Sequence, residues 1–138
     1  MLPQDLDPQR LEDSIEMLFA DHPRLLTHFY DTFFARYPEV RSLFSEADME
    51  MQKEHFFSTL LFAVKHLQHP DIFIPGLEEL GKRHYTEYKV LDKHYQPMVE
   101  MLLESMATIA GDKWQEELQQ QWRLALQLIF EVFKSSAR

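Results

Sequence analysis

Apolar side chains recur every three or four residues along almost all of this 138-residue chain. That period is typical of α-helices that each have one buried face. The signals of a sheet are missing, because the sequence has only 3 glycines and neither Asn-Gly turns nor runs of β-branched residues. Hydrophobic residues make up 45% of the chain and include 11 Phe, which is ample material for a core. The sequence therefore predicts an all-α protein.

Proline, glycine and aspartate divide the periodic pattern into separate helices. We expect helices over about residues 8–19, 23–37, 48–69, 75–88, 92–110 and 112 to the end, with a short helical turn over 38–44. Pro70 and Pro75 are expected to bracket a turn, and Asp112 with Gln115 resembles a capping box. Residues 1–7 are expected to form a loose arm, and residues 1–138 a single domain.

The charge of the chain excludes several classes of partner. Its formal net charge is −9, from 14 basic and 23 acidic residues, which argues against nucleic acid and against anionic membrane surfaces. The sequence contains no run of 18 apolar residues, the length needed to span a bilayer, and its acidic N-terminus does not resemble a signal peptide. Without cysteine, neither disulfides nor thiolate metal sites can form. We expect a cytoplasmic protein that does not bind membranes.

The segment 75–88 places a histidine on a buried helical stripe. The stripe consists of Leu77, Leu80, Gly81, His84, Tyr85 and Tyr88. A glycine inside a helix costs about 1 kcal/mol relative to alanine, and Gly81 lies one turn before His84, where it would let a flat, bulky group approach the backbone. The alternative is a core histidine with ordinary hydrogen bonds beside a tolerated glycine. The segment alone leaves both interpretations open.

Two aromatic residues upstream have a similar double interpretation. Tyr30 lies in the middle of the aromatic stripe of the second predicted helix, and its buried hydroxyl needs a hydrogen-bond partner. That partner is either a backbone carbonyl one turn back or a group in a binding site. Phe44 leads into the polar loop 45–49, so it either plugs one end of the core or forms the wall of a pocket.

The helix over 48–69 carries further polar candidates. Gln52 borders its apolar stripe one turn before Phe56, and His55 is rotated outwards towards the rim. His66 and His69 have the i, i+3 spacing of a metal-binding pair. Because no third ligand is near them in the sequence, we interpret them as surface histidines.

Together these features resemble the globin family, in particular the bacterial single-domain haemoglobins and the haem domain of flavohaemoglobins. The resemblance covers most of residues 25–133 and is carried by 28–44, 74–84 and 94–106, with Trp122 in the last helix. Its most specific part is the combination of Pro38, Phe44 and, forty residues later, His84 on the glycine-bearing helix. It implies an all-α globin fold of about seven to eight helices around a pocket for haem b, iron protoporphyrin IX.

The resemblance also implies roles for individual residues. His84 would be the iron ligand, and Phe44 would lie against the porphyrin face. Tyr30 and Gln52 would donate hydrogen bonds to bound O₂, and these would be the residues involved if the protein were an enzyme, together with Tyr95. The remaining haem contacts would come from Phe56 on the distal side, from Leu80 and Tyr95 on the proximal side, and from Met98 and His55.

The identity of the distal residue follows from the spacing to His84. Gln52 lies 32 residues before His84, which is the spacing of the bacterial relatives. His55 lies 29 residues before it, which is the spacing of animal myoglobins. The proximal segment resembles that of the bacterial relatives, so Gln52 is expected over the iron and His55 near a haem propionate.

The implied function is reversible binding of O₂, CO and NO, as in oxygen transport, by a monomer or weak homodimer. The alternatives are an NO dioxygenase, peroxidase or nitrite reductase that depends on a separate reductase, a gas sensor, and a globin-like scaffold without haem. In flavohaemoglobins an acidic residue completes a proximal His–Tyr–Glu network; its place here falls at about Ala137. The sequence also ends at Arg138 without a flavin domain. Both departures argue against autonomous NO dioxygenase turnover.

Overall fold

The computed structural model describes residues 5–44, 48–88 and 92–136, and of these the side chains of 80–88, 92 and 133–136 are not described. Within these ranges the chain forms seven α-helices and one short 3₁₀ helix, with no strand, so the all-α prediction is confirmed. The helices are α1 (Pro8–Phe19), α2 (His22–Arg36), α3 (Pro38–Leu43), α4 (Met49–Lys65), α5 (Pro70–Tyr88), α6 (Asp92–Ala110), η1 (Gly111–Lys113) and α7 (Glu116–Ser136).

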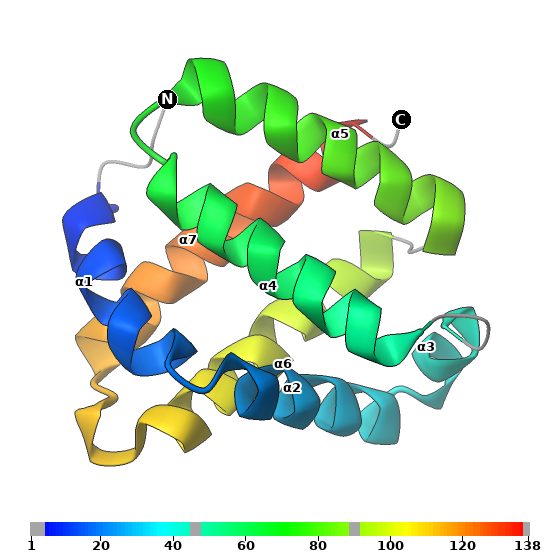
Figure 1. Cartoon of the computed structure of the whole chain (residues 1–138), viewed down its shortest axis with the longest axis horizontal. Helices are drawn as coiled ribbons and strands as arrows, with labels where there is room; N and C mark the ends of the chain where they lie inside the picture. Colours follow the sequence, from blue (N-terminus) through cyan, green and yellow to red (C-terminus); the bar gives the residue numbers. More distant parts are fainter. Residues whose placement is uncertain (1–4, 45–47, 89–91, 137–138) are drawn as a thin grey trace.

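The helices enclose one continuous apolar core. The largest helix–helix contacts are those of α5 with α7, α2 with α6, and α6 with α7. Figure 1 shows that α4 and α5 meet at the turn that joins them and diverge towards the side where α3 lies, so that they form a V. The fully buried side chains include Phe29 and Phe33 of α2, Leu60 of α4 and Trp122 of α7. None of the helices, within the described ranges, is long and apolar enough to cross a bilayer.

The ends of several helices are encoded locally. Asp7 accepts a hydrogen bond from the Arg10 N–H at 3.2 Å ahead of Pro8, which is suited to the first turn of α1. Asp48 caps α4 in the same way through the Glu50 and Met51 N–H groups, at 3.1 and 3.3 Å. At the C-terminal end of α6, Gly111 takes a positive φ of 58°, a conformation that glycine adopts without strain. The predicted end of this helix is therefore confirmed.

The predicted boundary between the fourth and fifth helices was wrong. The helix expected to reach residue 69 ends at Lys65, and the next begins at Pro70 with Pro75 inside it. Proline is favoured in the first turn of a helix, so Pro70 is suited to begin α5. The N–H groups of Ile72 and Phe73 both donate to the His69 carbonyl, each at 2.9 Å. Pro75 removes only one backbone hydrogen bond near this end. The tertiary packing of α5 outweighs that loss.

Gly76 explains how α4 and α5 approach each other so closely beyond the turn. A Cβ atom at Gly76 would lie 2.5 Å from Cζ of Phe62, a residue of α4. The ring of Phe62 therefore packs directly on the backbone of α5. This close approach fixes the closed end of the V from which the two helices diverge.

The capping box predicted for the last helix was also wrong. Asp112 lies in η1, and α7 begins only at Glu116. The Gln119 N–H donates to the Gln115 carbonyl at 3.0 Å, which opens α7 one turn later than expected. The Trp114 N–H instead donates to the Gly111 carbonyl at 3.0 Å, so the positive φ of Gly111 tightens the chain into a 3₁₀ turn first.

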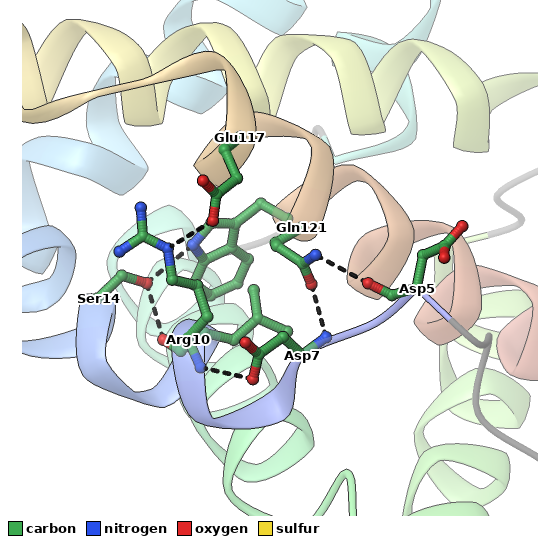
Figure 2. Close-up of polar contacts among 8 residues, drawn as sticks. Asp5, Asp7, Arg10, Ser14, Glu117 and Gln121 are labelled. Carbon is green, nitrogen blue, oxygen red and sulfur yellow. Dashed lines mark hydrogen bonds and ion pairs between the residues drawn. The ribbon is translucent and has the colours of Figure 1, made fainter.

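Of the expected N-terminal arm, the structure describes residues 5–7, and these form hydrogen bonds to α7 (Figure 2). The Asp7 N–H donates to Oε1 of Gln121 at 2.7 Å, and Nε2 of Gln121 donates to the Asp5 carbonyl at 2.9 Å. Leu6 between them is buried in the core. Residues 1–4 of the predicted arm lie outside the described residues.

A buried hydrogen-bond chain joins α1 to α7. The indole N–H of Trp122 donates to Oγ of Ser14 at 3.0 Å, and that hydroxyl donates to the Leu11 carbonyl at 2.7 Å. The indole of Trp122 is fully buried, so without Ser14 its N–H would lose this acceptor in a dry environment. The chain therefore contributes to the free energy of unfolding.

We expect Ser14→Ala to lower the free energy of unfolding by about 1–3 kcal/mol, the cost of leaving a buried donor unsatisfied. Urea unfolding followed by circular dichroism measures this loss. Ser42→Ala is the matched control, because the Ser42 hydroxyl makes the same type of bond to the Glu39 carbonyl at 2.7 Å but is exposed. The control should change stability by no more than about 0.5 kcal/mol. Equal effects of the two substitutions would contradict the role given to the buried chain.

Candidate functional site

The structure brings together two of the predicted site residues, Tyr30 and Gln52. Tyr30 projects inwards from the middle of α2, and Gln52 from the first turn of α4, where the Asp48 cap fixes the start of the helix. Each residue is only 4% exposed. Nε2 of Gln52 donates a hydrogen bond to the hydroxyl oxygen of Tyr30 at 3.2 Å. A buried polar pair thus lies inside an otherwise apolar region.

Four phenylalanine rings surround the ring of Tyr30, and we call them the Tyr30 aromatic shell. Their centroids lie 4.9 Å (Phe29), 5.6 Å (Phe34), 6.1 Å (Phe44) and 6.1 Å (Phe56) from that of Tyr30. Three of them meet the tyrosine ring edge to face, an arrangement that aromatic quadrupoles favour. The shell keeps the hydrogen bond between Tyr30 and Gln52 in a low-dielectric environment, where polar interactions are stronger than in water.

The location of Phe44 bears on the alternatives of plug and pocket wall. It follows α3 directly, and its N–H donates to the Arg41 carbonyl at 3.1 Å. Its side chain is buried and contacts Tyr30 and Phe34. Phe44 therefore closes the same cluster that contains the polar pair, rather than a separate end of the core.

His55 has a different environment from Gln52, although both lie on α4. Its side chain is exposed, and its backbone carbonyl accepts a hydrogen bond from the Thr59 hydroxyl at 2.9 Å. Gln52 is the buried one of the two candidates. The structure thus separates the two candidates, with Gln52 in the interior and His55 at the surface.

Two further predicted site residues, Tyr95 and Met98, lie on α6. Tyr95 and Met98 are both buried, and the ring of Tyr95 packs on that of Phe130 from α7 at a centroid distance of 5.3 Å. The predicted neighbours of Tyr95 are His84 and Leu80, whose side chains lie outside the described residues. The same holds for Ala137, the expected place of an acidic partner.

The backbone of α5 nevertheless gives the position of residue 84. Residue 84 lies seven residues after the fully buried Leu77, so the two occupy the same face of the helix. It is near the C-terminal end of α5, whereas Gln52 is in the first turn of α4. The first turn of α4 and the C-terminal part of α5 lie on opposite arms of the V, at the end where the two helices diverge (Figure 1).

The other histidines do not assemble into a metal site. Within the part of the chain that the structure describes, no group of three histidine, aspartate or glutamate side chains could hold a metal ion. One ring nitrogen of His66 hydrogen bonds to the Phe62 carbonyl at 2.9 Å, and His69 is exposed. His94 is buried, and desolvation lowers its pKa. We find no role in the site for these three residues.

Sequence reasoning missed the contact between Phe29 and Tyr30. Phe29 is fully buried and is the nearest member of the aromatic shell, yet it appeared in the sequence only as one of several aromatic residues on a stripe. Its position directly before an inward-facing tyrosine was the one available signal. Which rings touch across the core depends on side-chain rotamers, and these do not follow from spacing alone.

Comparisons with known proteins give the family and the fold of the chain. The sequence model of the family described as Globin matches residues 17–133. A flavohemoprotein of Vibrio cholerae is 23% identical over 125 residues, which are 89% of this chain and 32% of that protein. The chain thus spans about a third of the length of the curated relatives it matches.

Two solved structures share the fold. A hexacoordinated haem protein from an anhydrobiotic tardigrade superposes with a TM-score of 0.87 at 15% identity, covering 100% of this chain and 96% of that one. An engineered carbene transferase from Rhodothermus marinus also superposes with a TM-score of 0.87, at 23% identity, covering 99% of this chain and 94% of that one.

Proposed function

Because the chain belongs to the globin family, we propose that it binds haem b through His84 and that it binds O₂, CO and NO reversibly. The observation that carries this proposal is the buried hydrogen bond between Gln52 and Tyr30 inside the aromatic shell. A phenol and an amide are hydrogen-bond donors, and in an apolar interior they can bind a polar group of a ligand more strongly than they would in water. Bound O₂ has partial negative charge and is such a group.

The residues present fit a haem group in their chemistry. A neutral imidazole is the protein ligand of haem iron in globins, and position 84 lies across the V from the buried pair. Phe44, Phe56 and Met98 are buried and offer apolar or polarisable surface to a flat macrocycle, and Tyr95 and Leu80 would complete its proximal side. Haem, when bound, supplies an iron atom that takes up diatomic gases reversibly.

Side chains of this protein would stabilise the bound gas. Tyr30 and Gln52 would donate hydrogen bonds to bound O₂, and the aromatic shell would exclude the water that would otherwise compete for them. These donors favour a polar ligand over an apolar one, so O₂ would gain more than CO. An oxygen equilibrium curve measured by tonometry tests the proposal, since reversible saturation is expected and irreversible oxidation without an oxygenated state would contradict it.

A second candidate function is NO dioxygenation with electrons from a separate reductase. It is supported by the flavohemoproteins among the relatives, of which this chain matches only a third. Nitrate formed per NO added separates the two functions. A carrier should form about one nitrate per oxygenated haem and then stop, whereas an enzyme should continue for many turnovers once a flavoprotein reductase is added.

We expect His55→Leu to leave the deoxy-ferrous absorption spectrum unchanged and five-coordinate. The reason is that the His55 side chain is exposed, whereas Gln52 is buried beside Tyr30. Gln52→Leu is the matched comparison and should change O₂ dissociation instead. If the wild-type protein were six-coordinate and low-spin, and His55→Leu made it five-coordinate, the distal residue would be His55 and our assignment wrong.

A further inference from the structure

We propose that Phe29 is a positioning residue that holds the hydroxyl of Tyr30 within reach of Gln52 and of the bound gas. The inference rests on the proposed function and adds to it a residue that would act only through Tyr30. Phe29 is fully buried, and its ring meets that of Tyr30 at 4.9 Å with an interplanar angle of 64°. No other ring of the aromatic shell is as close to Tyr30.

Phe29 also joins the two helices that carry the polar pair. Its ring lies 5.3 Å from that of Phe56 on α4, and Phe56 in turn meets the edge of the Tyr30 ring at 6.1 Å. The three rings therefore form a closed triangle between α2 and α4. A tyrosine ring enclosed in this way has few rotamers, and its hydroxyl is held at one point.

The hydrogen bond from Gln52 to Tyr30 depends on where the Tyr30 hydroxyl is held. The distance from Nε2 of Gln52 to the Tyr30 hydroxyl oxygen is 3.2 Å, which is the long end of the usual range for such bonds. A displacement of the tyrosine ring by a few tenths of an ångström would therefore weaken the bond. Leucine in place of Phe29 removes the edge-to-face contact and leaves space into which the Tyr30 ring can turn.

A purely steric role for Phe29 makes a different prediction. If Phe29 only restricted the passage of ligands, its truncation would speed the departure of O₂ and CO alike. If it positions Tyr30, only the ligand that depends on the Tyr30 hydroxyl should leave faster. The ratio of the two dissociation rates therefore separates positioning from access.

The test compares Phe29→Leu, Tyr30→Phe, their combination and Phe33→Leu in the haem-loaded protein. Phe33→Leu is the matched control, because Phe33 is buried on the same helix and packs on Phe29, Phe34 and Tyr37. Phe29→Leu should raise the O₂ dissociation rate about 2- to 12-fold, the change that corresponds to losing one aromatic pair. CO dissociation should stay within about twofold, and Phe33→Leu should leave both rates nearly unchanged.

A spectroscopic signature accompanies these rates. The C–O stretching frequency of the CO complex falls when a donor points at the ligand, so Phe29→Leu should shift it upwards, part of the way to its value in Tyr30→Phe. Phe29→Met gives a second variant that fills the space without a ring, in case Phe29→Leu does not fold. It should show the same shift.

Several results would overturn the inference. These are an unchanged O₂ rate in both Phe29 variants, a parallel rise of the O₂ and CO rates, or a further rise of the O₂ rate when Phe29→Leu is added to Tyr30→Phe. Failure of the proposed function is distinguishable, because the wild-type protein would then give no CO complex or no oxygenated state from which O₂ dissociation could be measured.

Discussion

Replacement of His84 by alanine is expected to weaken haem binding on the order of 100-fold or more. Loss of a residue that only supports a metal ligand costs about 10- to 100-fold in metal affinity, and loss of the ligand itself should cost more. The imidazole would be the only bond from the protein to the iron, and alanine offers no ligand in its place. Position 84 shares a face of α5 with the buried Leu77. Haem titration followed by the Soret band measures the change.

Added imidazole provides the control for the His84 experiment. It should restore the wild-type spectrum, because the free ligand replaces the missing imidazole. His55→Ala removes an exposed histidine of α4 and should bind haem as the wild-type protein does. A wild-type spectrum of His84→Ala without added imidazole would mean that another residue holds the iron.

Replacement of Tyr30 by phenylalanine is expected to raise the O₂ dissociation rate about 10- to 150-fold, because a hydrogen bond to a charged acceptor contributes about 1.5–3 kcal/mol. The structure supports this size of effect, since Tyr30 is 4% exposed and lies within a shell that excludes water. The substitution keeps the ring and removes only the hydroxyl. Stopped-flow displacement of O₂ by CO measures the rate.

The dissociation of CO is the internal control for Tyr30→Phe and should change much less, because bound CO is less polar. Gln52→Leu should show the same selectivity. Since Gln52 donates to the Tyr30 hydroxyl at 3.2 Å, the effects of the two substitutions should not add in the double variant. An unchanged O₂ rate in Tyr30→Phe would make Tyr30 a core residue and leave the distal donor to another group.

Much of the fold could be predicted because residues next to the helix ends, such as proline and glycine, determine where several helices begin and end. The predicted start of the first helix at Pro8 and the predicted stop at Gly111 are confirmed, and the structure adds Asp7 as the cap of the first. Pro70 and Pro75 misled the prediction, because a proline can either start a helix or interrupt one. The helix that begins at Pro70 packs against Phe62 of α4 at Gly76, and the sequence does not show that these two helices are in contact.

The candidate site was predicted through the resemblance to globins, more than through the residues themselves. Periodicity placed Tyr30 and Gln52 on or beside inward stripes, but their hydrogen bond joins α2 to α4 across 22 positions of the sequence. The resemblance supplied that pairing. It did not supply the contact of Phe29 with Tyr30, because a family resemblance transfers named roles and says little about how the surrounding rings pack.

The most direct test of the account is the absorption spectrum of the purified protein loaded with haem, recorded in the ferric, deoxy-ferrous, CO-bound and O₂-bound states. We expect one haem per chain, a five-coordinate deoxy-ferrous state with histidine as the ligand, and an O₂ spectrum that reverts to the deoxy form when O₂ is removed. A protein that takes up no haem under these conditions would contradict the central claim and would indicate a globin fold used for another purpose.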